Sequence, residues 1–177
     1  MDIYIILNNI LSGCVTDIII EYVCGNFEMW SNDDIIIYLT QNYDYSSMCF
    51  KNLIFSKINF TNVNFAYANF SGSTFDELTF EEVNFEGANF TRAKFQNVKI
   101  QNSNLQGSIF NDAHLTNVMF EIVNLAHAQF HDTRLNTIYF INTIMRFVYF
   151  KRAKMVSIIF KKTVLHGVNF QKATLMC

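Results

Sequence analysis

The feature that most limits the fold of this chain is a strict five-residue period of large apolar residues. From residue 50 to residue 175, every fifth position is Phe, Leu, Ile or Met, without a gap or an insertion. Of these 26 positions 17 are Phe, and the residue two positions earlier is in most repeats small or β-branched, as at Ala68, Val98 and Thr143. An unbroken internal period of this kind predicts a repeat architecture.

A period of five fits neither of the common secondary structures. On an α-helix, steps of five residues place successive Phe side chains about 140° apart, so the helix would have no apolar face. On a flat strand, an odd step turns each Phe to the opposite side. The period is explained if the chain turns a corner within every repeat. Each repeat then directs its central residue i and residue i−2 to one interior, which predicts a coiled β-ribbon with a Phe-filled core.

Individual repeats also resemble a known signature. Residues 63–67 (VNFAY), 68–72 (ANFSG) and 88–92 (ANFTR) resemble the A(D/N)LXX motif of the pentapeptide-repeat family. The resemblance covers roughly three quarters of the chain and implies a mainly β fold, a right-handed quadrilateral parallel β-helix with four repeats per coil. It further implies that i and i−2 point inward and that i−1, i+1 and i+2 point outward. The 26 repeats then make about 6.5 coils.

With four repeats per coil, residues 20 positions apart lie above one another. One predicted core column is unbroken Phe, and the opposite column is nearly so. The two remaining columns change from Phe to smaller residues along the chain, as in Phe65, Phe85, Leu105, Leu125 and Met145. We therefore interpret these aromatic residues as core and assign them no ligand role. The unbroken column contains Phe50, Phe70, Phe90, Phe110, Phe130, Phe150 and Phe170.

The first 47 residues differ from the rest. Their apolar residues recur at helical spacing, and we expect residues 1–47 to form a short α-helical segment that caps the β-helix of residues 48–177 or docks a partner. The stretch from Ile3 to Val23 is interrupted by polar residues, so we expect no membrane span. Charge divides at the same boundary. Residues 1–47 carry a net charge of −7, whereas residues 48–177 carry +5. This asymmetry indicates a charged partner, or attraction of the N-terminal segment to the rod or to its far end, or merely a solvated helical face.

An outward column becomes apolar towards the C-terminus, where Asn59, Thr79 and Lys99 are followed by Met119, Tyr139 and Ile159. Further outward apolar residues occur in the same half. Contiguous exposed apolar patches usually mark interfaces, so we expect a homodimer through the C-terminal coils. The alternative is a scatter of surface apolar groups that contact nothing. The candidate interface contains Met119, Tyr139, Ile159, Tyr149 and Phe147, with Ile144 and Val164 nearby.

A second outward column is basic. Lys94, His114, Arg134 and Lys154 follow one another at every fourth repeat, and stacked cations of this kind favour an anionic partner surface. In the neighbouring column Asp112 and Asp132 are interleaved with basic residues. We expect these two acids to pair with Arg92 and Arg152, which would reduce the basic potential.

The sequence contains little that indicates catalysis. It has no Gly-rich phosphate loop, and its four His and four Cys residues lack the spacing of a metal site, so we expect no enzyme, cofactor or metal. The Cys residues also show no disulfide framework, which favours a reducing compartment, the cytoplasm, or the host cytoplasm for a secreted effector or viral protein.

The predicted function is a non-enzymatic protein-interaction module or scaffold, an adaptor or effector. The partner is not indicated, and neither membrane nor nucleic acid is expected as one. The alternative that the resemblance implies is a DNA-mimicking inhibitor or protector of gyrase. Its requirement for negative potential along the whole rod conflicts with the basic C-terminal half.

Overall fold

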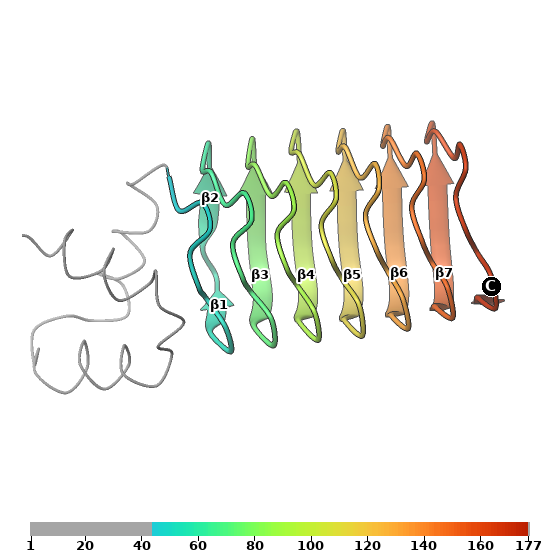
Figure 1. Cartoon of the computed structure of the whole chain (residues 1–177), viewed down its shortest axis with the longest axis horizontal. Helices are drawn as coiled ribbons and strands as arrows, with labels where there is room; N and C mark the ends of the chain where they lie inside the picture. Colours follow the sequence, from blue (N-terminus) through green and yellow to red (C-terminus); the bar gives the residue numbers. More distant parts are fainter. Residues whose placement is uncertain (1–43, 177) are drawn as a thin grey trace, which may run out of the picture.

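The computed structural model describes residues 44–176, which form a single β-helical rod (Figure 1). The rod is the right-handed quadrilateral parallel β-helix expected from the sequence. The predicted helical character of the N-terminal segment lies outside the described residues, apart from its last four positions. The strands are β1 (Ile54–Ser56), β2 (Asn59–Thr61), β3 (Thr74–Glu81), β4 (Lys94–Gln101), β5 (His114–Glu121), β6 (Arg134–Ile141), β7 (Lys154–Lys161) and β8 (Thr174–Met176).

All described strands pair in parallel, in the order β1-β3-β4-β5-β6-β7-β8, with β2 beside the second half of β3. Every pair joins residues 20 positions apart, as Phe75 joins Phe95 and Leu115 joins Leu135. One coil therefore contains four pentapeptides. We number the four faces of the rod by the core residue of their first repeat: face 1 from Phe50, face 2 from Phe55, face 3 from Phe60 and face 4 from Phe65.

The four faces differ in how their backbones pair. Strands β3 to β7 run along face 2, turn a corner and continue along face 3. Faces 1 and 4 are joined by single bridges, such as Asn69 to Asn89 on face 1 and Asn64 to Asn84 on face 4. The sheet is therefore continuous over two adjoining faces, and the other two faces are held by an isolated bridge in each coil.

The corners explain why five residues suffice for one side. From Ser47 to Lys172, every fifth residue has a positive φ, 22 of them non-glycine and four glycine. This is position i+2 of each repeat, and a left-handed residue there turns the chain by one corner. The turn is closed by a backbone bond such as Ala68 N–H to Phe65 C=O, at 3.1 Å. Each repeat therefore carries its own turn, which accounts for the absence of insertions.

The core is a stack of aromatic rings. Rings one coil apart lie nearly parallel, as for Phe110 and Phe130, whose centroids are 4.7 Å apart and whose planes differ by 1°. Rings of neighbouring columns meet edge to face, as for Phe80 and Phe85 at 4.9 Å and 86°. Both arrangements are favourable for aromatic quadrupoles. The i−2 positions fill the corners of the core, and a hydroxyl there is satisfied locally: Thr133 donates to the Phe130 carbonyl at 2.9 Å.

The repeat region begins before the run of apolar residues that the sequence pattern identifies. Asp44 already bridges to Asn64, and Tyr45 is 1% exposed. The Tyr45 ring stacks on Phe65 at 5.4 Å, where the period of five predicts a core residue. This repeat was missed in the sequence because only Phe, Leu, Ile and Met were counted. The described rod therefore includes the last four residues of the segment assigned to the cap, residues 44–47.

Candidate interaction surfaces

The candidate interface residues Met119, Tyr139 and Ile159 form one strip on face 3. They belong to β5, β6 and β7 and are direct partners in the parallel ladder. Met119 and Tyr139 are half-buried, and Ile159 is 48% exposed. The strip ends towards the N-terminus at Lys99, whose Nζ lies 3.0 Å from a carboxylate oxygen of Glu121. We call Met119, Tyr139 and Ile159 the face-3 strip.

The apolar surface continues around the corner from face 3 to face 4. Ile122 occupies that corner with a φ of 56° and is 54% exposed. Ile144 and Val164, bridged to each other on face 4, are each 43% exposed. A β-branched residue at positive φ is a genuine backbone outlier. The sequence analysis did not identify Ile122, because the repeat pattern predicts no apolar residue at position i+2. The signal that identifies it is an isoleucine at an exposed corner with left-handed backbone.

Phe147 and Tyr149 do not belong to the face-3 strip. Phe147 lies at the corner between faces 4 and 1, and Tyr149 lies on face 1, which is opposite face 3. The Phe147 ring stacks on His127 at 5.4 Å and meets His166 edge-on at 5.5 Å. The five candidate residues therefore form two surfaces that point in different directions, because Phe147 and Tyr149 stand one and a half to two repeats after Tyr139 on a four-sided rod.

The basic column is assembled as the spacing predicts. Lys94, His114, Arg134 and Lys154 are successive ladder partners on β4 to β7, and all four are exposed. Within residues 44–176, ion pairs form only between Lys99 and Glu121 and between Arg152 and Asp132, so the cations of this column have no acidic partner there. The pKa of His114 is lowered by partial burial, and further by the positive charges of Arg134 and Lys94. We call these four residues the basic column.

Three residues of the basic column, His114, Arg134 and Lys154, form one wall of a shallow groove of about 460 Å³ on face 2. Thr116, Asn136 and Val156 form the facing wall, and Leu115 and Leu135 lie at its floor. Met176 borders the groove at the C-terminal coil. The two walls are the i−1 and i+1 positions of the same repeats, so the groove runs parallel to the rod axis over the coils of β5 to β8. Its positive charge is supplied by Arg134 and Lys154, with no carboxylate among its lining residues.

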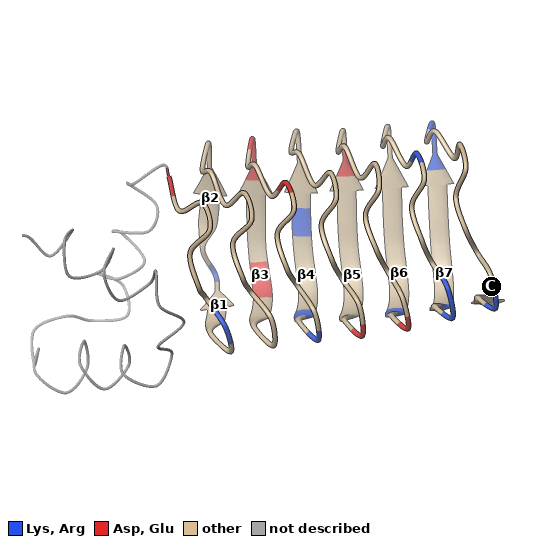
Figure 2. Cartoon of the chain, viewed as in Figure 1, with Lys and Arg blue, Asp and Glu red and all other residues tan. Residues whose placement is uncertain are grey.

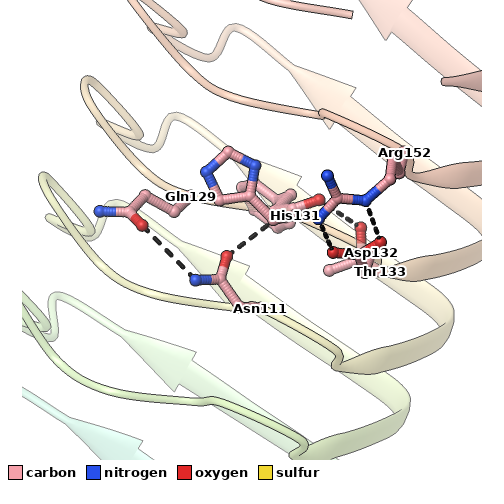
Figure 3. Close-up of polar contacts among 7 residues, drawn as sticks. Asn111, Gln129, His131, Asp132, Thr133 and Arg152 are labelled. Carbon is pink, nitrogen blue, oxygen red and sulfur yellow. Dashed lines mark hydrogen bonds and ion pairs between the residues drawn. The ribbon is translucent and has the colours of Figure 1, made fainter. Parts of the chain in front are cut away.

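At the neighbouring corner, between faces 1 and 2, only one of the two expected ion pairs forms. Arg152 donates through Nε and Nη2 to the two carboxylate oxygens of Asp132, at 2.6 and 2.5 Å (Figure 3). These bonds hold the pKa of Asp132 below its usual value. The expected pair between Asp112 and Arg92 is absent from the ion pairs of residues 44–176. Beside this corner, Asn111 accepts a bond from the His131 backbone N–H at 3.0 Å (Figure 3).

Acidic residues gather in the N-terminal half of the rod, in the coil of β3 (Figure 2). Residues of β3 and of the segment after it supply most of them, while the coils of β7 and β8 are basic (Figure 2). Tyr67 donates to the Glu86 carboxylate at 3.0 Å, which raises the pKa of the phenol. Charge is therefore sorted along the rod. The acidic cluster contains Asp76, Glu77, Glu81, Glu82 and Glu86.

The described part of the chain shows neither a metal centre nor a membrane span. No group of three or more His, Cys, Asp or Glu side chains within residues 44–176 is placed to hold a metal ion. In the same residues, no helix has the length and apolar character needed to cross a bilayer. The candidate sites within the described residues are outer surfaces. They are the face-3 strip, the corner where Phe147 contacts His127 and His166, and the groove on face 2 beside Arg134 and Lys154, which we call the basic groove.

Comparison with known families decides the identity of the fold. The profile described as Pentapeptide repeat region matches residues 40–110, and the profile described as Pentapeptide repeats (8 copies) matches residues 100–136. Together they span residues 40–136, more than half of the chain. The chain is a pentapeptide-repeat protein. The match begins before Asp44, in agreement with the extra repeat around Tyr45.

Solved structures of other pentapeptide-repeat proteins are similar at low sequence identity. QnrB1, a plasmid-mediated fluoroquinolone resistance protein, is 13% identical with a TM-score of 0.44, over 74% of this chain and 83% of its own. A pentapeptide repeat protein from the thylakoid lumen of Arabidopsis thaliana is 19% identical with a TM-score of 0.44, over 63% and 70%. Rfr23 from the cyanobacterium Cyanothece 51142 is 12% identical with a TM-score of 0.42, over 80% and 97%. No curated protein sequence matches significantly.

Proposed function

We propose that this pentapeptide-repeat protein is a non-enzymatic protein-interaction module and that it associates as a homodimer through the face-3 strip. The observation that carries the proposal is the ladder of Met119, Tyr139 and Ile159, an outward row in which polar residues give way to apolar ones. Ile122 at the adjoining corner supports it. A strained, exposed isoleucine contributes nothing evident to the folded monomer, and strain of this kind gathers at functional positions.

The rod suits docking rather than catalysis. Its faces are built from short repeats without inserted loops, so outward side chains are presented at a fixed spacing of about 4.8 Å between coils. A rigid face loses little conformational entropy when it binds. A symmetric contact places each strip against its copy, so a single substitution acts twice in the dimer.

Light scattering of Tyr139→Lys tests the proposal. We expect the substitution to shift the assembled species to monomer, because a buried lysine without a partner opposes association. The same column tolerates a lysine in the fold, since Lys99 occupies it naturally. The measurement is made at 500 mM NaCl, which suppresses association through exposed charges.

Thr79→Lys is the matched control. It introduces the same residue into the same outward column, on β3 at the other end of the rod, and it should leave the assembled mass unchanged. Circular dichroism confirms that both variants retain the fold. A wild-type protein that stays monomeric at its highest soluble concentration contradicts the dimer.

A gyrase-directed function is the second candidate, because QnrB1 is a fluoroquinolone resistance protein of the same family. The acidic cluster around β3 is the feature that favours it (Figure 2). The basic coils of β7 and β8 oppose it, since a DNA mimic needs phosphate-like charge along the rod. A gyrase supercoiling assay separates the two functions: an interaction module leaves supercoiling unchanged.

A further inference from the structure

We propose that the basic groove on face 2 binds the acidic N-terminal segment, residues 1–43, of a second copy of this chain. The association is head to tail and uses a different surface from the face-3 strip. The occupant is defined by charge complementarity. Residues 1–43 contain six acidic residues and no Lys or Arg, whereas residues 133–177 contain eight Lys and Arg and no acidic residue.

The groove carries positive charge that the described rod leaves uncompensated. Arg134 and Lys154 are ladder partners on adjoining strands, yet neither forms an ion pair within residues 44–176. Like charges directly opposite in a ladder are destabilising. The pKa of His114 is lowered mainly by partial burial and also by this repulsion, because Arg134 and Lys94 face it. Bound carboxylates would relieve this repulsion.

Arg152 lies near the groove but differs from Arg134 and Lys154, because it has an acidic partner within the rod. It occupies the neighbouring corner in the coil of β7 and forms a bidentate bond with Asp132 (Figure 3). A partner within the rod therefore exists for a corner cation, but not for the cations of the groove. The apolar side chains of Val156 and Met176 border the same groove. The site consequently fits a segment that is both acidic and apolar, which is the composition of residues 1–43.

A second copy is a better source of this segment than the same copy. The N-terminal segment joins the rod at Asp44, and Lys154 lies five and a half coils further along the ladder. At about 4.8 Å per coil this separation is roughly 26 Å, several times the Debye length of about 8 Å at physiological ionic strength. Within one copy the attraction between the segment and the groove is screened unless the segment extends along the rod, and such an extension costs conformational entropy. An end-to-end contact would instead bring Asp44 of one copy, where the segment joins the rod, next to the basic C-terminal coils of the other.

Sedimentation equilibrium of the full chain provides the first test, in a Tyr139→Lys background that removes association through face 3. We expect the average mass to rise with protein concentration at 50 mM NaCl and to fall to that of the monomer at 500 mM. The double variant Arg134→Glu/Lys154→Glu should associate more weakly, with a dissociation constant at 50 mM NaCl that is at least about tenfold higher. Lys51→Glu/Lys57→Glu makes the same change of charge in the first coils and should associate like its parent.

Charge exchange provides the second test. Asp33→Lys/Asp34→Lys should also weaken self-association, and mixing it with Arg134→Glu/Lys154→Glu should restore association between the two variants. Carbodiimide cross-linking of mixed ¹⁴N and ¹⁵N protein should then join residues 1–43 to Lys154 in peptides of mixed isotope. Cross-links of a single isotope only, a monomer at low salt, or full association of Arg134→Glu/Lys154→Glu would each overturn the proposal.

Discussion

Leu125 and Leu165 occupy the same core column of face 4, but the structure gives them different surroundings. Leu125 is fully buried between coils, whereas Leu165 in the last full coil is 44% exposed. The cost of truncating a leucine depends on the cavity that remains and on how far the site can collapse. The contribution of a core residue in this rod therefore depends on the coil that contains it.

The comparison of Leu125→Ala with Leu165→Ala tests this dependence. We expect Leu125→Ala to reduce the free energy of unfolding by about 2–5 kcal/mol, because it leaves a closed cavity. Leu165→Ala should cost less than half as much, because its site is already open to water. Urea unfolding followed by circular dichroism measures both. Equal losses would mean that the end coil is covered in solution.

At the scale of the element, face 4 is held by a ladder of asparagine side chains. Asn64 donates through Nδ2 to Asp44, Asn84 donates to Asn64, Asn104 to Asn84 and Asn124 to Asn104, at 3.1 to 3.3 Å. Each Oδ1 of these four asparagines also accepts the backbone N–H two residues further on. The ladder thus joins each local turn to the next coil. It ends where Ile144 and Val164 replace asparagine, which is where face 4 becomes apolar.

The substitutions Asn104→Ala and Asn69→Ala separate the two roles of these side chains. Asn104 belongs to the ladder and also accepts the Gln106 N–H of its own turn. Within the described rod, the side chain of Asn69 forms one hydrogen bond, in which it accepts the Ser71 N–H of its own turn. We expect Asn104→Ala to cost about 1 kcal/mol more, the net value of the bonds between coils. The difference in urea midpoint at constant m-value measures it. A loss at Asn69 as large as that at Asn104 would show that only the local turn matters.

At the scale of the whole molecule, the rod is a one-dimensional array in which each coil contacts its neighbours. Residues align only when they differ by 20 positions, as every strand pair shows. The strip, the groove and the ladder all depend on this register. Sorting of charge along the rod depends on it as well, because position along the chain becomes position along the axis (Figure 2).

Two deletions test the register. Removal of residues 101–120 takes out one coil and joins Ile100 to Glu121, which preserves all four faces. Removal of residues 101–110 rotates every later residue to the opposite face, so it breaks the asparagine ladder and places unlike residues above one another. We expect the one-coil deletion to unfold at a higher temperature than the half-coil deletion, although it removes twice as much chain. Thermal unfolding followed by circular dichroism decides the order, and the reverse order would contradict the coil register.

The fold was predictable from sequence because its core is a local pattern. Phe90 is buried for the same reason as Phe70 and Phe110: each lies at the centre of a repeat that carries its own turn. The alignment of residues in the basic column and in the face-3 strip could be predicted from the same count of four repeats per coil. Their roles in binding stay predictions. Tyr45 was missed because tyrosine was not among the residues counted, although its position obeys the period.

The amino-acid pattern was enough to establish the period, the four-sided coil and the residues that point inward, because those depend on contacts within one repeat and on stacking of identical repeats. Which outward residues meet became clear only in the folded rod. There Phe147 and Tyr149 are separated from Tyr139, Asp132 pairs with Arg152 while Asp112 forms no ion pair with Arg92, and Ile122 occupies a strained corner. Such contacts depend on side-chain reach and corner geometry. A five-residue period repeats the backbone path but does not specify either one.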